Sequence, residues 1–301
     1  MKSLRRKPTD GELNILRVLW DRGPSTVREV AAAMRTAITA AIVAFCVAAP
    51  IAQDTKGYDE LLDTYVRDGE VYYRALKSDR GKLDAFINQL GGANIDRLSR
   101  DEKVAFWINA YNALVLRTIV DHYPITGKSA QYPQKSIRQI PGAFERTPHR
   151  VAGRTVTLDQ IEQTILTEFA DPRIFLALGR GAEDGGRLRS EAYGGARLES
   201  QLTEAAAECI TRQHCIQVDR TNNKVVISPI FSWREKEFSS AYADKAPKEF
   251  AARSPIERAV LAFVQPKLLT TEKEQLEKNT FTVEFGQFDW KLNDLTGRGG
   301  R

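Results

Sequence analysis

Residues 101–123 have the sequence DEKVAFWINAYNALVLRTIVDHY, and this stretch decides the fold that we expect. Ser99 precedes it, and Glu102 follows three residues later, which is the pattern of a capping box at the start of a helix. Pro124 ends the helical pattern. Most of the surface of the predicted helix is apolar, so we expect this helix to lie at the centre of a domain.

The sequence on both sides predicts a helix-rich domain with a few short strands. A β-branched run at 137–156 with a turn at Ala152-Gly153, and a hairpin pattern around DRTNNK (219–224), predict strands. Apolar periodicity predicts helices at 58–76, 79–90, 158–169, 198–210, 232–242 and 255–263, and further strands at 174–178 and 281–285. We therefore expect a single α+β domain with a small, mainly antiparallel sheet, preceded by a short helical stub.

Composition excludes few functions. The chain has 301 residues, of which 42% are hydrophobic and 28% charged, as in ordinary globular proteins. Its formal charge of +5 is mild and does not argue for nucleic acid as a partner. After residue 52 no segment is long and apolar enough to cross a bilayer.

Residues 34–53, MRTAITAAIVAFCVAAPIAQ, have the layout of a secretory signal peptide. Cleavage after Ala49 or Ala52 would follow the small-residue rule. We expect an exported protein, periplasmic or extracellular, or a membrane-anchored one if the leader is not cleaved. The predicted organisation is a stub at 1–33, a signal peptide or signal anchor at 34–52, the domain at 53–295 and a disordered tail at 296–301.

The stub contains two predicted helices, with capping boxes at Thr9/Glu12 and Thr26/Glu29. Its sequence PTDGELNILRVLWDRGPSTVREVAAAM (8–34) resembles the start of the penicillinase-repressor family of winged-helix proteins. The recognition helix of that family does not follow, so we expect no specific binding to nucleic acid. Three explanations remain open: Met34 is the true start, a gene rearrangement left a repressor fragment, or the stub is a cytoplasmic tail.

Cysteine usage is sparse. Cys46 lies in the predicted leader, which leaves Cys209 and Cys215 in the domain. On one continuous helix these two would lie roughly 9 Å apart, so a disulfide requires the helix to end near Arg212. A disulfide, two structural thiols and a metal site with His214 are the alternatives; we predict neither a metal site nor a cofactor.

Six phrases of the domain, in order, resemble the bacterial family called domain of unknown function 547. The resemblance spans residues 59–293 and implies an exported protein with this fold, but no reaction. The phrases are FWINAYNALVLRTI (106–119), VAGRTVTLDQIEQTIL (151–166), DPRIFLAL (171–178), LRSEAY (188–193), VISPIFSW (226–233) and FDWKLN (288–293).

The resemblance also implies what this chain lacks. Relatives often carry two histidines and two cysteines in the phrases IEH, DPRIH and NCGAxSCP. The corresponding residues here are Gln163, Phe175, Arg180 and Gly185. Thiol catalysis needs a cysteine with a neighbouring base, so the resemblance implies that this chain has lost any such chemistry.

The loop after residue 178 suggests a different ligand. Glycines free backbone N–H groups and arginines provide guanidinium forks, and together they can hold a small anion. The alternative is a plain turn whose arginines pair with Glu183, Asp184 and Glu191. The candidate anion site comprises Arg180, Arg187, Arg189, Gly181 and Gly185.

Asn109, Asn112 and Asp289 complete the set of candidates. Each amide either ties the central helix to a loop or lines a polar cleft, and Asp289 is either a structural anchor or part of that cleft. The leading hypothesis is a non-thiol envelope binding or accessory protein. The alternatives are a hydrolase or transferase with a cleft around Asn112, Arg180 and Asp289, and a DNA-binding repressor.

Overall fold

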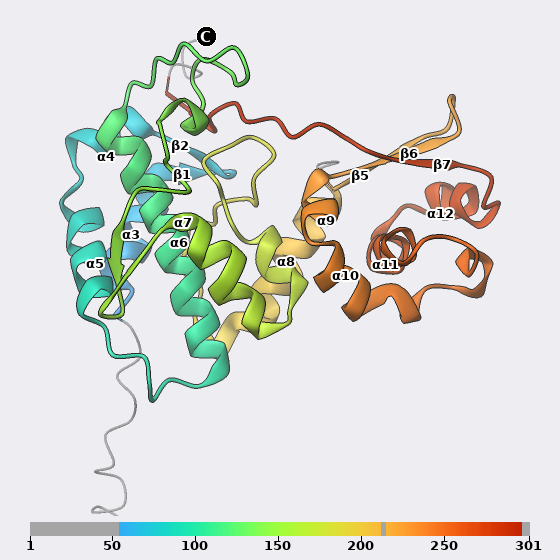
Figure 1. Cartoon of the computed structure of the whole chain (residues 1–301), viewed down its shortest axis with the longest axis horizontal. Helices are drawn as coiled ribbons and strands as arrows, with labels where there is room; N and C mark the ends of the chain where they lie inside the picture. The colour runs from blue at the N-terminus through green and yellow to red at the C-terminus, as the bar shows by residue number, and fades with distance from the viewer. Residues whose placement is uncertain (1–53, 212–214, 297–301) are drawn as a thin grey trace, which may run out of the picture. The chain divides into compact units, whose positions relative to one another are not determined.

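Helix α6 (Arg100–His122) is the helix around which the N-terminal half of the domain packs (Figure 1). Ser99 and Glu102 form the predicted capping box, and every residue from Val104 to Leu116 is buried. A helix buried on all sides is what the uniformly apolar sequence predicts. The computed structural model describes residues 54–211 and 215–296, all within one unit, Gln53–Arg301. The predicted stub and leader and all but the first residue of the tail lie outside these ranges.

Three helices precede α6: α4 (Tyr73–Ser78) and α5 (Gly81–Gly92) pack against it, and α3 (Lys56–Tyr65) packs against α5. The prediction of one helix over 58–76 is wrong, because β1 (Val66–Arg67) and β2 (Glu70–Val71) form a hairpin inside it. Asp68 and Gly69 make the turn with φ values of 54° and 88°. An Asp-Gly pair favours this turn, and here it overrides the helical periodicity.

The segment after α6 contains irregular helices. Strands β3 (His149–Val151) and β4 (Arg154–Val156) pair as predicted, around the Ala152-Gly153 turn. The predicted helix at 158–169 is present as α7 (Leu158–Gln160), a π-helical turn η2 (Ile161–Ile165) and a 3₁₀ turn η3 (Leu166–Phe169).

The strand predicted at 174–178 is wrong. Residues Pro172–Leu176 form the 3₁₀ helix η4, which begins with Pro172 and is capped by the side chain of Asp171. A short apolar run does not distinguish a buried strand from a buried helical turn, and Pro172 at the first helical position favours the turn.

The C-terminal half contains a three-stranded sheet and five helices. Strands β5 (Ile216–Asp219) and β6 (Lys224–Ile227) form the predicted hairpin, and β7 (Thr282–Phe285) pairs with β6 in parallel. The helices are α8 (Leu198–Thr211), α9 (Pro229–Trp233), α10 (Glu235–Tyr242), α11 (Pro255–Val264) and α12 (Thr270–Glu277). The predicted helix at 232–242 is divided at Arg234. The α+β class, with short and mainly antiparallel sheets, is confirmed.

The segment after β7 returns to the N-terminal hairpin (Figure 1). Val71 N–H donates to Asn293 O at 2.9 Å, and Leu295 N–H donates to Val71 O at 3.0 Å. The side chain of Asn293 accepts from the Tyr73 hydroxyl and donates to Gly69 O. These bonds fasten the two ends of the described chain together.

Cys209 and Cys215 form a disulfide, with their Cα atoms 5.2 Å apart. Helix α8 ends at Thr211, as a bridge between these two cysteines requires. Of the alternatives left open by the sequence, the disulfide is therefore the one observed. It connects the end of α8 to the start of β5.

We predict that the double change Cys209→Ser, Cys215→Ser lowers the free energy of unfolding by about 2–3 kcal/mol, because the unfolded chain regains the entropy of the closed loop. Urea unfolding of the variant and of the wild type measures the difference. The wild type in excess reductant serves as the control and should match the variant. Equal stability of oxidised and reduced wild type would contradict the prediction.

Candidate functional site

The glycines of the loop after η4 allow its backbone to pack closely on itself. Gly185 N–H donates to Ala182 O at 3.1 Å, and Gly186 N–H donates to Leu178 O at 2.8 Å. A Cβ atom on Gly185 would lie 2.1 Å from Gly179 O. Gly181 has a φ of +63°, and a Cβ there would meet Ile119 at 2.4 Å. The N–H groups of Gly185 and Gly186 are thus used within the loop.

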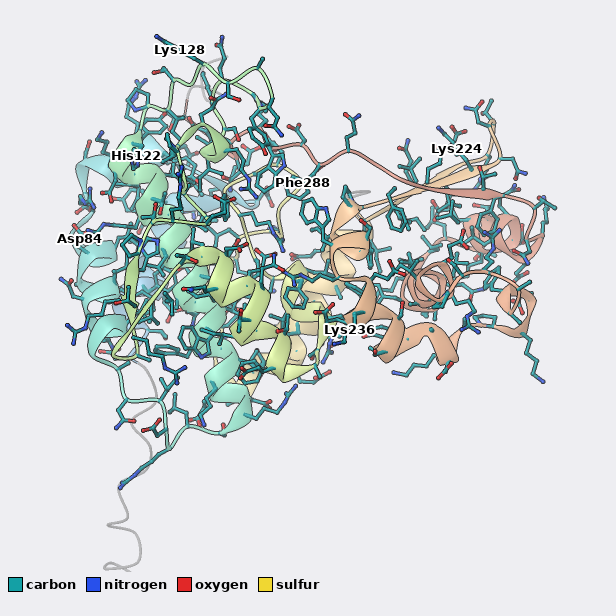
Figure 2. All side chains as sticks on the ribbon, viewed as in Figure 1. Asp84, His122, Lys128, Lys224, Lys236 and Phe288 are labelled. Carbon is teal, nitrogen blue, oxygen red and sulfur yellow. A yellow bond between two sulfur atoms is a disulfide. The ribbon has the colours of Figure 1, made fainter. Side chains whose placement is uncertain are left out.

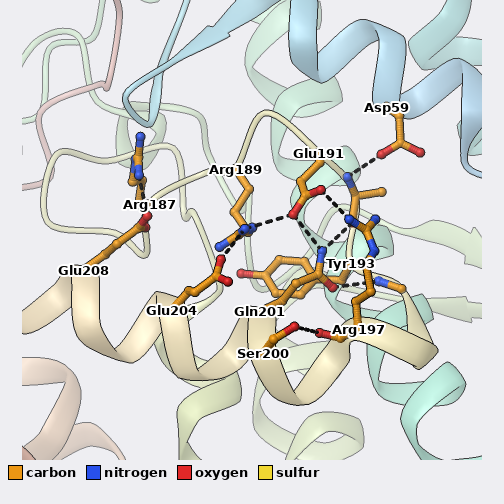
Figure 3. Close-up of polar contacts among 12 residues, drawn as sticks. Asp59, Arg187, Arg189, Glu191, Tyr193, Arg197, Ser200, Gln201, Glu204 and Glu208 are labelled. Carbon is orange, nitrogen blue, oxygen red and sulfur yellow. Dashed lines mark hydrogen bonds and ion pairs between the residues drawn. The ribbon is translucent and has the colours of Figure 1, made fainter.

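The three arginines of the loop point to different places. Arg180 is 1% exposed and turns into the core. Arg187 pairs with Glu208 of α8 and with Asp68, whereas Arg189 pairs with Glu191 and Glu204, as Figure 3 shows for the contacts along α8. Arg180 and Arg187 therefore do not face one cleft, as a shared anion site would require.

Arg180 belongs to a buried ionic cluster that consists of Glu162, Arg180, Arg234 and Tyr111. Glu162 Oε1 accepts from Arg180 Nη2 at 2.6 Å and from Arg234 Nη2 at 3.0 Å, and Oε2 accepts from the Tyr111 hydroxyl at 2.8 Å. Arg180 Nη1 donates to the carbonyls of Phe175 and Leu178 at 3.0 and 3.2 Å. Arg180 adopts a left-handed backbone conformation, with a φ of 47°, which few non-glycine residues do.

The electrostatics of the ionic cluster keep Glu162 ionised. Burial by itself would raise the pKa of this carboxyl, but the guanidinium of Arg180, the charge of Arg234 and the Tyr111 hydroxyl lower it to about 2. Burial and the same carboxylate raise the pKa of Tyr111 well above its usual value. Neither group is suited to exchange a proton near neutral pH.

Arg234 also covers Phe175. Its guanidinium carbon lies 4.1 Å from the centre of the Phe175 ring, and both side chains are almost fully buried. This cation–π contact and the bond to Glu162 leave the guanidinium within the protein interior. The ionic cluster was missed from the sequence, although Glu162 and Arg180 lie in or beside the phrases that carry the family resemblance.

Asn109 and Asn112 tie α6 to two loops. The Asn109 amide exchanges two hydrogen bonds of 2.8 Å with the backbone of Tyr193. The Asn112 amide donates to Ala177 O at 3.1 Å and accepts from Gly179 N–H at 2.9 Å. Asn112 also lines a cavity of about 10 Å³, which neither Arg180 nor Asp289 lines. These amides satisfy backbone groups that would otherwise be buried without partners.

Asp289 helps to hold the C-terminal segment in place through hydrogen bonds. Its N–H donates to Asp184 Oδ2 at 2.8 Å, and its Oδ1 accepts from Lys291 N–H at 2.8 Å. The side chains of Asn112, Arg180 and Asp289 therefore make separate sets of contacts. The structure does not bring them together into the cleft that the enzyme hypothesis requires.

A pocket of about 160 Å³ does lie against the loop. Arg187 and Gly185 line it, but Arg180, Arg189 and Gly181 do not. Its single arginine shares the lining with several acidic side chains. Anion binding by this loop stays a prediction. The acidic residues of the lining are Asp68, Glu70, Glu183, Asp184 and Glu208.

Trp233, Phe288 and Trp290 form an aromatic cluster that was not predicted from the sequence (Figure 2 labels Phe288). The ring centres of Phe288 lie 5.0 Å from Trp233 and 4.5 Å from Trp290, and Trp233 is 43% exposed. The guanidinium of Arg138 lies 4.4 Å from the centre of the Trp290 ring. The phrases VISPIFSW and FDWKLN contain all three aromatic residues and were the available signal. The rings pack the C-terminal segment against α9.

Within residues 54–211 and 215–296, no three His, Cys, Asp or Glu side chains are grouped as metal ligands. No helix in these ranges has the length and apolar character of a membrane span.

Residues 95–210 match the family model described as "Protein of unknown function, DUF547". The match covers less than half of the chain and supports the resemblance over four of the six phrases. No curated protein and no solved structure matches the chain. The matched segment includes Glu162 and Arg180 but ends before Arg234 and the aromatic cluster.

We predict that Glu162→Gln destabilises the fold by about 3–5 kcal/mol, because it leaves two buried guanidinium groups without their counter-charge. The pKa of Glu162 is lower in the folded state than its ordinary value of 4.5. Ionised Glu162 therefore stabilises the fold above about pH 4.5, and this contribution is lost as the pH falls towards 2. The variant should lack that part of the acid sensitivity.

Urea unfolding between neutral and acidic pH tests both statements. Glu204→Gln is the matched control, because Glu204 pairs with Arg189 at the surface and such pairs contribute under about 1 kcal/mol. If Glu162→Gln cost no more than the control, the ionic cluster would not be holding the fold.

Proposed function

We propose that this chain is an exported binding or accessory protein that performs no thiol chemistry. The proposal is carried by one observation: the ionic cluster fills the place where the resemblance puts catalytic-type residues. Arg180 stands where relatives often have a cysteine, and its guanidinium is held by Glu162 and two carbonyls. Phe175 stands at a histidine position and lies beneath Arg234. A thiolate with a neighbouring base has no place in this arrangement.

The remaining histidine and cysteine positions support the same conclusion. Gln163 is exposed, and Gly185 has its N–H bonded within the loop. Cys209 and Cys215 are joined in a disulfide, so neither is a free nucleophile. The geometry also gives no support to a cleft of Asn112, Arg180 and Asp289, and the enzyme hypothesis is not proposed further.

Two observations support export. Residues 34–52 have the signal-peptide pattern, and the domain contains a disulfide, which persists in oxidising compartments. In a bacterial host we therefore expect the mature protein outside the cytoplasm, beginning at Pro50 or Gln53. Cell fractionation followed by N-terminal sequencing measures both. Ile42→Arg should block export by placing a charge in the apolar run, and Ile42→Leu is the matched control. A mature, folded protein that retains Met1 would contradict the proposal.

The absence of thiol chemistry has a direct test. We predict that the purified mature protein incorporates no iodoacetamide until it is treated with a reductant, because Cys46 leaves with the leader and the other two cysteines are bridged. Mass spectrometry measures the incorporation, and the reduced, unfolded protein, which should take up two labels per chain, is the control. Labelling of the native, untreated protein would overturn the non-thiol role.

A further inference from the structure

A second pocket, of about 270 Å³, lies between α5, the C-terminal half of α6 and the start of β3. We call it the His149 cavity. Ile87, Leu114 and Pro148 form an apolar side. The other side carries charged and ionisable groups from α6 and β3, among them His122, which Figure 2 labels at the end of α6. The polar lining residues are Arg117, Thr118, Asp121, His122, Thr147, His149 and Arg150.

The charges of the His149 cavity leave a positive excess. Asp121 is the single carboxylate in the lining, and it is already bound by Arg80 at 2.7 Å and by Arg117 at 3.2 Å. Arg117 also lies 3.6 Å from Asp84 of α5. Arg150 is paired with Thr155 in the β3–β4 ladder, and its side chain makes no hydrogen bond or ion pair with any other residue that the structure describes. A guanidinium without a counter-charge at the edge of a pocket attracts an anion.

The floor of the cavity has an unsatisfied polar atom. His149 Nε2 is buried and has no hydrogen-bond partner among the described residues. The backbone of His149 is held in the β3–β4 ladder opposite Val156. Leaving a ring nitrogen buried and unpaired costs free energy, and a bound ligand oxygen would remove that cost.

The second histidine of the lining, His122, has a hydrogen-bond partner in its own helix. His122 Nδ1 lies 2.8 Å from Thr118 O, and Thr118 Oγ1 donates to Leu114 O. Thr118 and the Nδ1 atom of His122 are therefore bonded within α6, whereas His149 Nε2 and the Arg150 guanidinium have no partner among the described residues. The apolar side formed by Ile87, Leu114 and Pro148 would cover a short hydrocarbon chain.

We propose that the His149 cavity binds a small organic carboxylate, whose oxygens accept from His149 Nε2 and the guanidinium of Arg150 and whose apolar part packs on Ile87 and Leu114. Arg117 supplies additional positive charge. This inference goes beyond the role proposed above and is independent of it, because it uses neither the ionic cluster nor the cysteines.

The pKa of His149 provides a measure of carboxylate binding. Burial and the charge of Arg117 lower it to about 4, while Asp121 opposes the shift. The imidazole is therefore neutral at physiological pH. A bound carboxylate beside the ring favours its protonated form and must raise this pKa. By linkage, affinity for the carboxylate rises as the pH falls towards the raised pKa of His149 in the complex.

The experiment is a titration of the mature protein with sodium butyrate, followed through the ring C–H signals of its histidines by NMR. The chain contains three histidines, and His149→Gln assigns the signal of His149. We expect a saturable shift of that signal, a raised pKa for His149 and an affinity that Arg150→Ala lowers about tenfold, the loss of one exposed charge-assisted bond. Arg154→Ala, an exposed arginine on the same hairpin, is the control and should change nothing.

Sodium chloride at equal ionic strength and inorganic phosphate are titrated in parallel. Chloride should give no saturable shift, and phosphate should bind more weakly than butyrate, because it has nothing to place on the apolar side. The proposal is overturned if butyrate leaves the His149 signal unchanged, if phosphate binds as tightly, or if Arg154→Ala weakens binding as much as Arg150→Ala. Near-ultraviolet circular dichroism confirms that each variant is folded.

Discussion

The carboxylate of Glu162 joins four segments that are distant in the sequence. It lies in the π-helical turn η2, and it binds Arg180 of the glycine-containing loop, Arg234 between α9 and α10, and Tyr111 of the central helix α6. The carboxylate and the two guanidinium groups would each cost several kcal/mol if they were buried alone. The segments are therefore coupled, because moving any one of them leaves a buried charge without one of its partners.

The loop after η4 is shaped by this constraint. Arg180 holds a left-handed conformation that directs its side chain inward, and Gly185 and Gly186 let the neighbouring backbone pack too closely for any Cβ atom. Asn109 and Asn112 bind the backbone on either side of the loop to α6. Residues 179–182, the first part of a loop that resembles an anion cradle in sequence, are thus buried in the domain, and residues 183–187 are half-buried.

The features that hold the fold and those that remain open to a ligand lie in different places. The ionic cluster is closed, and its carboxylate has a pKa of about 2. The His149 cavity instead combines an exposed guanidinium, a buried ring nitrogen without a partner and an apolar side. The segment that matches the family model, residues 95–210, contains Tyr111, Glu162 and Arg180 of the ionic cluster and most of the cavity lining, whereas Arg234 and Ile87 lie outside it.

Local patterns in the sequence determined the elements whose signals are local. The capping box and uniform apolarity of α6 predicted a buried helix, and turn residues predicted the β3–β4 and β5–β6 hairpins, because caps and turns depend on a few neighbouring residues. The class of the fold followed from these elements. The Asp68-Gly69 pair is also a local turn signal, but the helical periodicity of the residues around it led to the prediction of a helix there.

Only the tertiary structure decided the roles of the polar residues. Glu162 and Arg234 are separated by 72 positions, and Arg187 and Asp68 by 119. No spacing rule connects such pairs, so the sequence showed the arginines without their partners. An arginine has the same one-letter code whether its guanidinium is exposed to water or buried against a carboxylate. Packing alone decides which of the two it is, because packing determines the solvation and the counter-charge of each side chain.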